Sequence, residues 1–310
     1  MRTNTLEYTD FKALFLQALQ QNNLPTLEEA TVQSFYRFNT HLLEVNKTTN
    51  LTAIRNIDDV IIKHDIDSLL ASDLIPTGAK MLDLGCGPGF PSIPLAIARP
   101  DLTITALDST AKKIAFVNQT ADLLGLSNLK GISGRAEDRA LAKQLGNFDA
   151  VISRAVARLN ILAELCLPYV QIGGRLIAMK AAKAEEEVTE ATHAIRLLGG
   201  APAIIHQKSL STFNTTKEAR CLVVVQKTKE TPSAYPRVYA TILKKPLEPN
   251  VSRETFSLSS SEMFHVKHFC FYSKKQKLFG FFILYVAFSR TMWYNNIDRC
   301  KIVKRKDVLI

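Results

Sequence analysis

Lys80-Met-Leu-Asp-Leu-Gly-Cys-Gly-Pro-Gly89 is the stretch of this chain that decides its fold. Its first five residues are mostly apolar and predict a buried strand, and the glycines that follow predict a tight loop. A helical pattern then begins at about Pro91. A strand, a glycine loop and a helix in this order bring backbone N–H groups close to a nucleotide-like ligand.

The spacing of the glycines distinguishes between cofactors. Gly85, Gly87 and Gly89 form G-x-G-x-G, whereas dinucleotide-binding loops follow G-x-G-x-x-G. An acid, Asp83, also stands two residues before the first glycine. These features favour S-adenosylmethionine over NAD. A nicotinamide-dependent oxidoreductase is the alternative from another enzyme class, and a non-catalytic module that binds nucleic acid is a third.

The pattern of elements divides the chain into three parts. Residues 1–74 show helical periodicity and predict a helical region packed on the core, whose last helix runs from about 58 to 74. Residues 75–247 alternate between strands and helices. Such alternation predicts an α/β fold with a doubly wound, seven-stranded, mostly parallel sheet. The expected strands are 80–84, 103–107, 129–133, 150–153, 174–179, 203–207 and 221–227, the last of them antiparallel.

Two acids follow strands at the edge of the sheet where ligands bind. Asp108 ends the second strand, nineteen residues after Gly89, where a carboxylate can accept hydrogen bonds from a ribose diol. Capping of the next helix is the structural alternative. Ala136 and Glu137 follow the third strand, where an adenine would lie, although they could also form the opening turn of a helix.

Other charged residues are candidates for the same edge. Arg154 follows the fourth strand and could hold the methionine carboxylate or a phosphate. Arg158 and Lys180 could face RNA. His64 and Asp67 precede the glycine unit, where a lone histidine is more often structural than catalytic.

Composition sets broader limits. The chain has 310 residues, a formal net charge of +10 and five cysteines without a CxxC pair. The charge suggests an acidic partner such as nucleic acid. Scattered thiols and the lack of an N-terminal apolar run predict a cytoplasmic protein with no metal and no membrane span.

Several motifs together resemble the RsmG (glucose-inhibited division B) methyltransferases over about residues 5–247. The resemblance implies a class I methyltransferase with a Rossmann-like fold. Its implied reaction is methylation of N7 of one guanine in the 530-loop region of 16S ribosomal RNA. The substrate would be either the free RNA or the small ribosomal subunit that contains it. The motifs occur in the family's order and are Asn50–Arg55, His64–Leu69, Asp83–Pro91, Leu107–Ser109 with Lys113, Arg135–Glu137, Ile152–Ala155, Met179–Lys180, Tyr235–Arg237 and Lys244–Leu247.

The resemblance also implies site residues. It places the cofactor against Gly85, Phe90, Ala136, Glu137 and Arg154, and it adds Asn50 to the residues that could meet RNA. Asp108 matches the acidic ribose position by its motif alone. Ala181 departs from the family pattern, which usually has glycine after the lysine.

The expected chemistry needs no general base, and we assign no catalytic residue from the sequence. Guanine N7 carries an unprotonated lone pair, so its methylation requires alignment of N7, methyl carbon and sulfur rather than proton removal. A methyltransferase that acts on another RNA or on a small molecule is the alternative within this class.

Residues 248–310 differ from the rest of the chain. They carry 11 of the 39 Lys and Arg residues but only 5 of the 29 Asp and Glu residues. Their apolar run, 278–288, is too short for a membrane, which needs ~20 residues. Val251–Thr255 and Phe264–Lys267 can be encoded by one palindromic string, GTTTCACGTGAAAC, read in two frames. We therefore expect a disordered tail or translated intergenic sequence.

Overall fold

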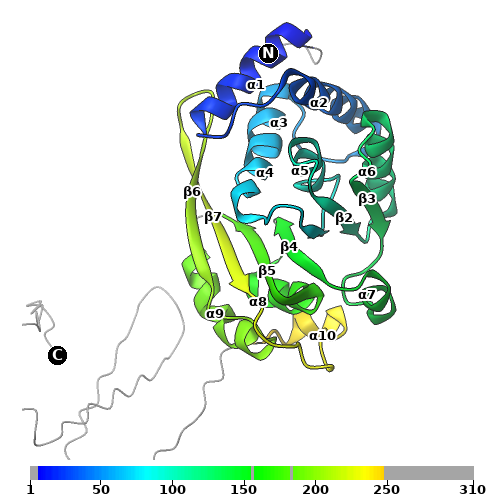
Figure 1. The fold of residues 1–310 in the computed structure, drawn as a ribbon, viewed down its shortest axis with the longest axis vertical. Coiled ribbons are helices and arrows are strands. Elements are labelled where there is room, and N and C mark those ends of the chain that lie inside the picture. The colour runs from blue at the N-terminus through cyan, green and yellow to red at the C-terminus, as the bar shows by residue number, and fades with distance from the viewer. Residues whose placement is uncertain (1–5, 155–156, 182–183, 248–310) are drawn as a thin grey trace, which may run out of the picture. The chain divides into compact units, whose positions relative to one another are not determined.

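The seven expected strands form one sheet in the computed structural model, which describes residues 6–154, 157–181 and 184–247 (Figure 1). The strand order is β3-β2-β1-β4-β5-β7-β6. All neighbours pair in parallel except β7, which is antiparallel to both β5 and β6. The strands are β1 (Lys80–Leu84), β2 (Thr103–Asp108), β3 (Leu129–Ser133), β4 (Phe148–Arg154), β5 (Val170–Lys180), β6 (Ile204–Ser211) and β7 (Lys217–Gln226).

This topology confirms the predicted α/β fold. The order reverses between β1 and β4, and ligands bind in such sheets at the carboxyl ends of the strands near that reversal. Several strands are longer than expected: β5 begins at Val170 rather than at 174. The residues added at its start include Gln171 and Gly173, which interrupt the apolar pattern that identifies a buried strand.

Helices cover both faces of the sheet (Figure 1). Those that follow the glycine loop are α5 (Ser92–Ala98), α6 (Ala111–Leu124), α7 (Arg139–Leu145), α8 (Leu159–Cys166), the 3₁₀ turn η3 (Leu167–Tyr169), α9 (Ala184–Leu197) and α10 (Tyr239–Lys244). Alternate residues of β1 enter opposite cores: Met81 belongs to the core that contains α5 and α6, and Leu82 to the core that contains α8 and α9. A strand buried on both faces requires this nearly continuous apolar sequence.

The N-terminal helices share the first of these cores. They are α1 (Tyr8–Gln21) and α2 (Glu29–Thr49), and their phenylalanines Phe11, Phe15, Phe35 and Phe38 are completely buried in the same cluster as the sheet residues. Phe15 and Phe35 join the two helices with ring centroids 4.7 Å apart. The helical region is therefore packed on the sheet, which positions the segment that follows α2 above the strand ends.

That segment differs from the single helix that we expected. It consists of α3 (Ile57–Val60), a π-helix η1 (Ile61–Ile66), α4 (Asp67–Leu69) and a 3₁₀ turn η2 (Ser72–Leu74). The π-helical turn inserts at 61–66, where His64 and Asp65 lie, and π-turns are frequent at functional sites. Periodicity over so short a segment could not distinguish a π-turn from an α-turn.

The last described segment is fixed to α8 by a buried ion pair. Glu164 is completely buried and accepts hydrogen bonds from the Arg237 backbone N–H, Nε and Nη2 at 2.9, 2.8 and 2.6 Å. This anchor positions α10 beside the sheet. The expected tail at 248–310 lies outside the described residues. None of the helices in the described part of the chain combines the length and apolar composition that a membrane crossing needs.

Candidate functional site

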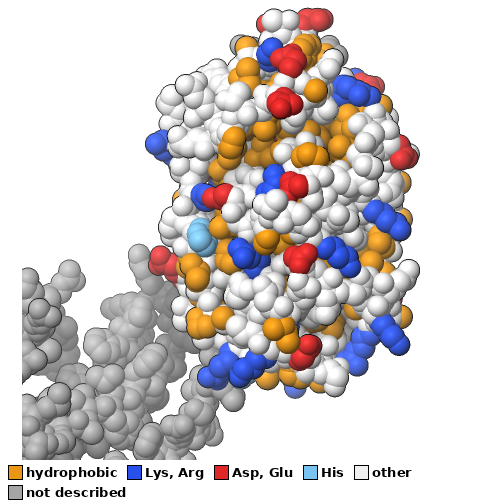
Figure 2. Space-filling model, in the orientation of Figure 1, with side chains coloured by type: hydrophobic (Ala, Val, Ile, Leu, Met, Phe, Trp, Pro, Cys, Tyr) orange, Lys and Arg blue, Asp and Glu red, His pale blue; other side chains and the backbone are white. Residues whose placement is uncertain are grey.

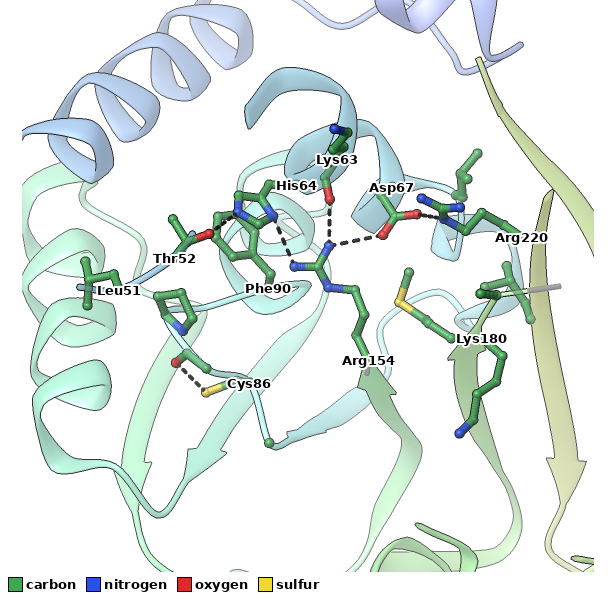
Figure 3. Close-up of a pocket in the computed structure, with 17 residues that line it drawn as sticks. Leu51, Thr52, Lys63, His64, Asp67, Cys86, Phe90, Arg154, Lys180 and Arg220 are labelled. Atoms are coloured by element: carbon green, nitrogen blue, oxygen red, sulfur yellow. Dashed lines mark hydrogen bonds and ion pairs between the residues drawn. The ribbon is translucent and has the colours of Figure 1, made fainter. Parts of the chain in front are cut away.

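Two cavities open at the carboxyl ends of the parallel strands, and both are lined by Gly85. One, of about 430 Å³, lies between the glycine loop, the η1 segment and the ends of β4, β5 and β7. We call it the Arg154 cavity (Figure 3). The other, of about 220 Å³, lies between the ends of β1, β2 and β3 and contains Asp108, Ala136 and Glu137, and we call it the Asp108 cavity.

The glycine loop adopts a backbone conformation that glycine enters readily and other residues do not. Gly85, Gly87 and Gly89 have φ values of +76°, +55° and +100°, a region that other residues rarely enter. The backbone N–H groups of Gly85 and Cys86 both donate to the Leu107 carbonyl, at 2.8 and 3.1 Å. The loop is thus held against the end of β2, and Gly85 and Gly87 face the Arg154 cavity.

Asp108 joins the glycine loop to the next helix. Its Oδ2 accepts from the Gly87 N–H at 3.0 Å and its Oδ1 accepts from the Thr110 N–H at 2.8 Å. The N-cap of α6 is Thr110, so Asp108 is not the cap of that helix; it holds the residue before α6 and also lines a cavity. Each carboxylate oxygen has a further lone pair, so contact with a ribose stays a prediction.

Ala136 and Glu137 lie in a turn rather than in a helix. The helix α7 begins at Arg139, and Asp138 caps it by accepting from the Ala140 and Leu141 N–H groups. The opening turn of a helix, which we considered for Ala136 and Glu137, is therefore wrong. The Ala136 carbonyl accepts a hydrogen bond from the Tyr169 hydroxyl at 2.9 Å, which fixes the turn at the cavity wall.

Arg154 extends from the end of β4 into its cavity, where residues of η1 and the first residue of α4 bind it (Figure 3). Its Nη1 donates to the Lys63 carbonyl at 3.0 Å and to Asp67 Oδ2 at 3.1 Å, and its Nη2 lies 3.3 Å from His64 Nδ1. The guanidinium also lies 5.2 Å from the centre of the Phe90 ring, where a cation is attracted to the aromatic face.

His64 occupies the wall of the same cavity. Its ring stacks on Phe90 with centroids 4.1 Å apart, and its Nε2 lies 2.9 Å from Thr52 Oγ1. Burial, together with the positive charge of Arg154, lowers the pKa of His64 to about 3. The His64 ring is therefore neutral near pH 7 and cannot act as a general acid there.

Asp67 bridges two arginines. Beside its contact with Arg154, its Oδ1 accepts from Arg220 Nε at 2.7 Å, and the Asp67 side chain is only 10% exposed. Arg220 comes from β7 and was missed by sequence reasoning, as were Thr52 and Tyr239. No spacing relates these residues to the glycine loop, because Thr52 comes from the loop after α2, Arg220 from the antiparallel strand and Tyr239 from α10.

Asp83 lies beneath the glycine loop. It is completely buried, and its Oδ2 accepts from the Ser92 N–H at 3.1 Å and from the Ser92 hydroxyl. Its Oδ1 has no partner among the described residues. Burial raises the pKa of Asp83 to about 7.

The remaining candidates divide between the cavity and the surface. Lys180 lines the Arg154 cavity and pairs with Glu187 at 2.8 Å. Asn50 lies outside both cavities, where it ends α2 and accepts from Arg55 at 3.2 Å. Arg158 is 58% exposed in an ion pair with Glu190. The described residues contain no cluster of three groups suited to hold a metal ion.

The face in Figure 2 shows Lys and Arg side chains dispersed with Asp and Glu between them. This face does not present a continuous basic field of the kind that binds nucleic acid strongly by charge alone.

Comparison with known proteins gives a consistent result. A family model described as rRNA small subunit methyltransferase G matches residues 31–215. The chain is 41% identical over 241 residues to ribosomal RNA small subunit methyltransferase G of Desulforamulus reducens, which covers 77% of this chain and 99% of that relative. The protein of the same name from Lachnoclostridium phytofermentans is 42% identical over 236 residues, covering 75% of this chain and 96% of the relative.

Proposed function

Because this chain belongs to the rRNA small subunit methyltransferase G family, we propose that it transfers a methyl group from S-adenosylmethionine to N7 of one guanine in 16S ribosomal RNA, in the 530-loop region. The observation that carries this proposal is the pair of cavities that meet at Gly85. One presents carboxylates, which suit a ribose and an adenine amino group, and the other presents a guanidinium, which suits a carboxylate.

The residues around these cavities fit the cofactor. A Cβ added at Gly87 would meet no atom within 4 Å, so the backbone there is open to a ligand. In our proposal Asp108 contacts the ribose, Ala136 and Glu137 contact the adenine, and Arg154 contacts the methionine carboxylate. Gly85 lines both cavities, and Gly87 and Phe90 line the Arg154 cavity beside it.

The proposed methyl transfer requires alignment of guanine N7 with the methyl carbon and the sulfur of the cofactor. When bound, S-adenosylmethionine would supply a methyl group on a positively charged sulfur, and attack of a lone pair on the methyl carbon would release that sulfur as S-adenosylhomocysteine. Guanine N7 offers such a lone pair without proton removal, so no described residue needs to act as a base. The residues of the Arg154 cavity bind and orient the two reactants, which is the main source of rate in such a transfer.

The target base would enter beside His64, Asp67 and Lys180, which line the Arg154 cavity. Asn50 and Arg158 lie outside it and are candidates for contacts with the RNA backbone. The partner is 16S ribosomal RNA or the small subunit that contains it, and the expected compartment is the cytoplasm. Another RNA, or a small molecule, is the alternative substrate.

The test of this function is deletion of the gene from its host. We expect one N7-methylguanine to disappear from 16S ribosomal RNA in mass spectra of nuclease fragments, and the wild-type gene to restore it. The fragment that changes identifies the site. An intact set of N7-methylguanines in the deletion strain would refute the proposal, and a mark lost elsewhere would favour the alternative substrate.

A further inference from the structure

Arg154 uses only part of its hydrogen-bonding capacity within the protein. A guanidinium has five N–H donors. The bonds to the Lys63 carbonyl and to Asp67 use both hydrogens of Nη1, and the contact with His64 uses one of Nη2. The Nε–H and the second Nη2–H are left, and two such donors on a planar fork match a carboxylate.

The three protein partners of Arg154 lie on one side of its guanidinium. In Figure 3, His64 and the Lys63 carbonyl of η1 and Asp67 of α4 approach from the same side, while the glycine loop with Cys86 lies on the other side of the cavity. The partners therefore fix the rotation of the guanidinium about its own axis. That rotation decides which donors face the glycine loop.

His64 is suited to this task by its tautomer. Because a guanidinium can only donate, Nδ1 of His64 must accept, and the proton of the neutral ring must lie on Nε2. The Nε2–H then donates to Thr52 Oγ1 at 2.9 Å, and the same oxygen accepts from the Ile54 N–H at 3.2 Å. Every polar atom of the imidazole has a partner, and stacking on Phe90 fixes the plane of the ring.

We propose that His64 is a positioning residue for the cofactor: its Nδ1 holds the Arg154 guanidinium in the rotation that presents Nε–H and the free Nη2–H to the methionine carboxylate. This inference rests on the proposed function of the site. His64 is not a base in this role and does not touch the methyl group. It acts through Arg154, and it should therefore affect the amino-acid end of the cofactor more than the adenosine end.

The test compares two ligands and three variants of the full-length protein by calorimetry. S-adenosylhomocysteine has the carboxylate, whereas 5′-methylthioadenosine lacks the amino-acid end. His64→Phe retains an aromatic ring against Phe90 but removes the acceptor, and His64→Asn retains an acceptor but removes the ring. His206→Phe, on β6 and outside both cavities, is the matched control.

We expect His64→Phe to reduce the ratio of S-adenosylhomocysteine affinity to methylthioadenosine affinity about tenfold, which is the effect of one hydrogen bond to a charged group. His64→Asn should keep most of that ratio, and His206→Phe should keep all of it. Equal loss of both ligands, or no loss, in a folded His64→Phe protein would overturn the proposal. If the wild type binds neither ligand, the proposed function fails first and this inference fails with it.

A second measurement applies to the wild type and does not depend on folding of a variant. Long-range ¹H–¹⁵N spectra at pH 7 should show the His64 ring neutral, with its proton on Nε2. A proton on Nδ1, or a charged ring, would contradict acceptance from Arg154 and overturn the proposal.

Discussion

Arg154 is the central residue of the proposed cofactor site. It is the only described guanidinium that extends from a parallel strand end into the cavity beside the glycine loop. Its contacts with Lys63, His64 and Asp67 mean that it is oriented before any ligand binds. An arginine oriented in advance loses less entropy on binding than a mobile one.

Arg154→Ala should therefore weaken S-adenosylmethionine binding by about tenfold to a hundredfold, because one charge-assisted, bidentate contact is lost. Calorimetric titration measures the affinity directly. Arg196→Ala, on the exposed end of α9, is the control and should bind as the wild type does. Unchanged affinity in Arg154→Ala would remove this residue from the proposed site.

A second residue-scale feature is a buried carboxyl group on the side of η1 that faces α2. Asp65 is completely buried, and its Oδ2 accepts from Asn39 Nδ2 at 2.6 Å. Asp65 Oδ1 and Asn39 Oδ1 are both buried without a partner among the described residues. Burial raises the pKa of Asp65 well above its usual value. A proton on Asp65 Oδ1 would satisfy both oxygens with one hydrogen bond.

This arrangement predicts a pH dependence of stability. A raised pKa in the folded state means that the folded chain keeps a proton which the unfolded chain releases above about pH 4, so the unfolding free energy falls as pH rises toward the folded pKa. Asp65→Asn should form both hydrogen bonds without that proton. Between pH 5 and 8, the stability of the wild type should fall relative to this variant by about 1–3 kcal/mol.

Urea unfolding at both pH values measures this difference. Asp122→Asn, at an exposed position on α6, is the control and should follow the pH dependence of the wild type. If Asp65→Asn also follows the wild type from pH 5 to 8, Asp65 is not protonated in the folded protein.

At the scale of elements, the glycine loop and α5 form one unit in which the glycines have different roles. A Cβ at Gly89 would lie 2.4 Å from Cδ1 of Ile93, whereas a Cβ at Gly87 would meet open space. Gly87 lines the Arg154 cavity and Gly89 does not. One glycine therefore permits close packing of the helix, and the other permits close approach of a ligand.

Two alanine variants should separate these roles. Gly89→Ala should lower the unfolding free energy by about 2–4 kcal/mol, because overpacking adds to backbone strain at a φ of +100°. Gly87→Ala should cost only about 1–2 kcal/mol in strain but should weaken S-adenosylmethionine binding. Thermal unfolding and calorimetry measure the two effects. If one of the two variants showed both the larger loss of stability and the larger loss of S-adenosylmethionine affinity, this division of roles would be contradicted.

At the scale of the whole molecule, the last described segment is joined to α8 through Arg237. The ion pair with the buried Glu164 holds the segment that carries α10, and Tyr239 of that helix lines the Asp108 cavity. The alignments with the two relatives cover nearly the whole length of each relative but only about three quarters of this chain. We therefore propose that the methyltransferase lies within residues 1–247, with the helical region 1–74 packed on the methyltransferase domain 75–247.

Truncation after Leu247 should retain the thermal midpoint and the methylation activity, because it keeps Arg237 and α10. Truncation after Thr231 is the matched control. It removes the partner of the buried Glu164 and should cost about 3–5 kcal/mol of stability. Loss of methylation in the first truncation, measured with isolated small subunits, would show that residues 248–310 take part in the function.

Sequence patterns alone determined the order of the strands along the chain and the residues at their carboxyl ends. An apolar run between glycines has few ways to fold, because buried backbone groups must pair and a strand buried on both faces must be apolar. Asp108, Glu137 and Arg154 could be placed at one edge of the sheet for that reason. The family resemblance supplied the substrate, since nothing in the glycine loop distinguishes one methyl acceptor from another.

Only the tertiary structure showed how these residues are held. Lys63 and His64 reach Arg154 from the π-turn and Asp67 from the residue after it, and Arg220 reaches Asp67 from an antiparallel strand 153 residues away in the chain. No periodic pattern in the sequence predicts these contacts. Periodicity reports which face of an element is buried, whereas the partner of a polar side chain is decided by the packing of whole elements against each other.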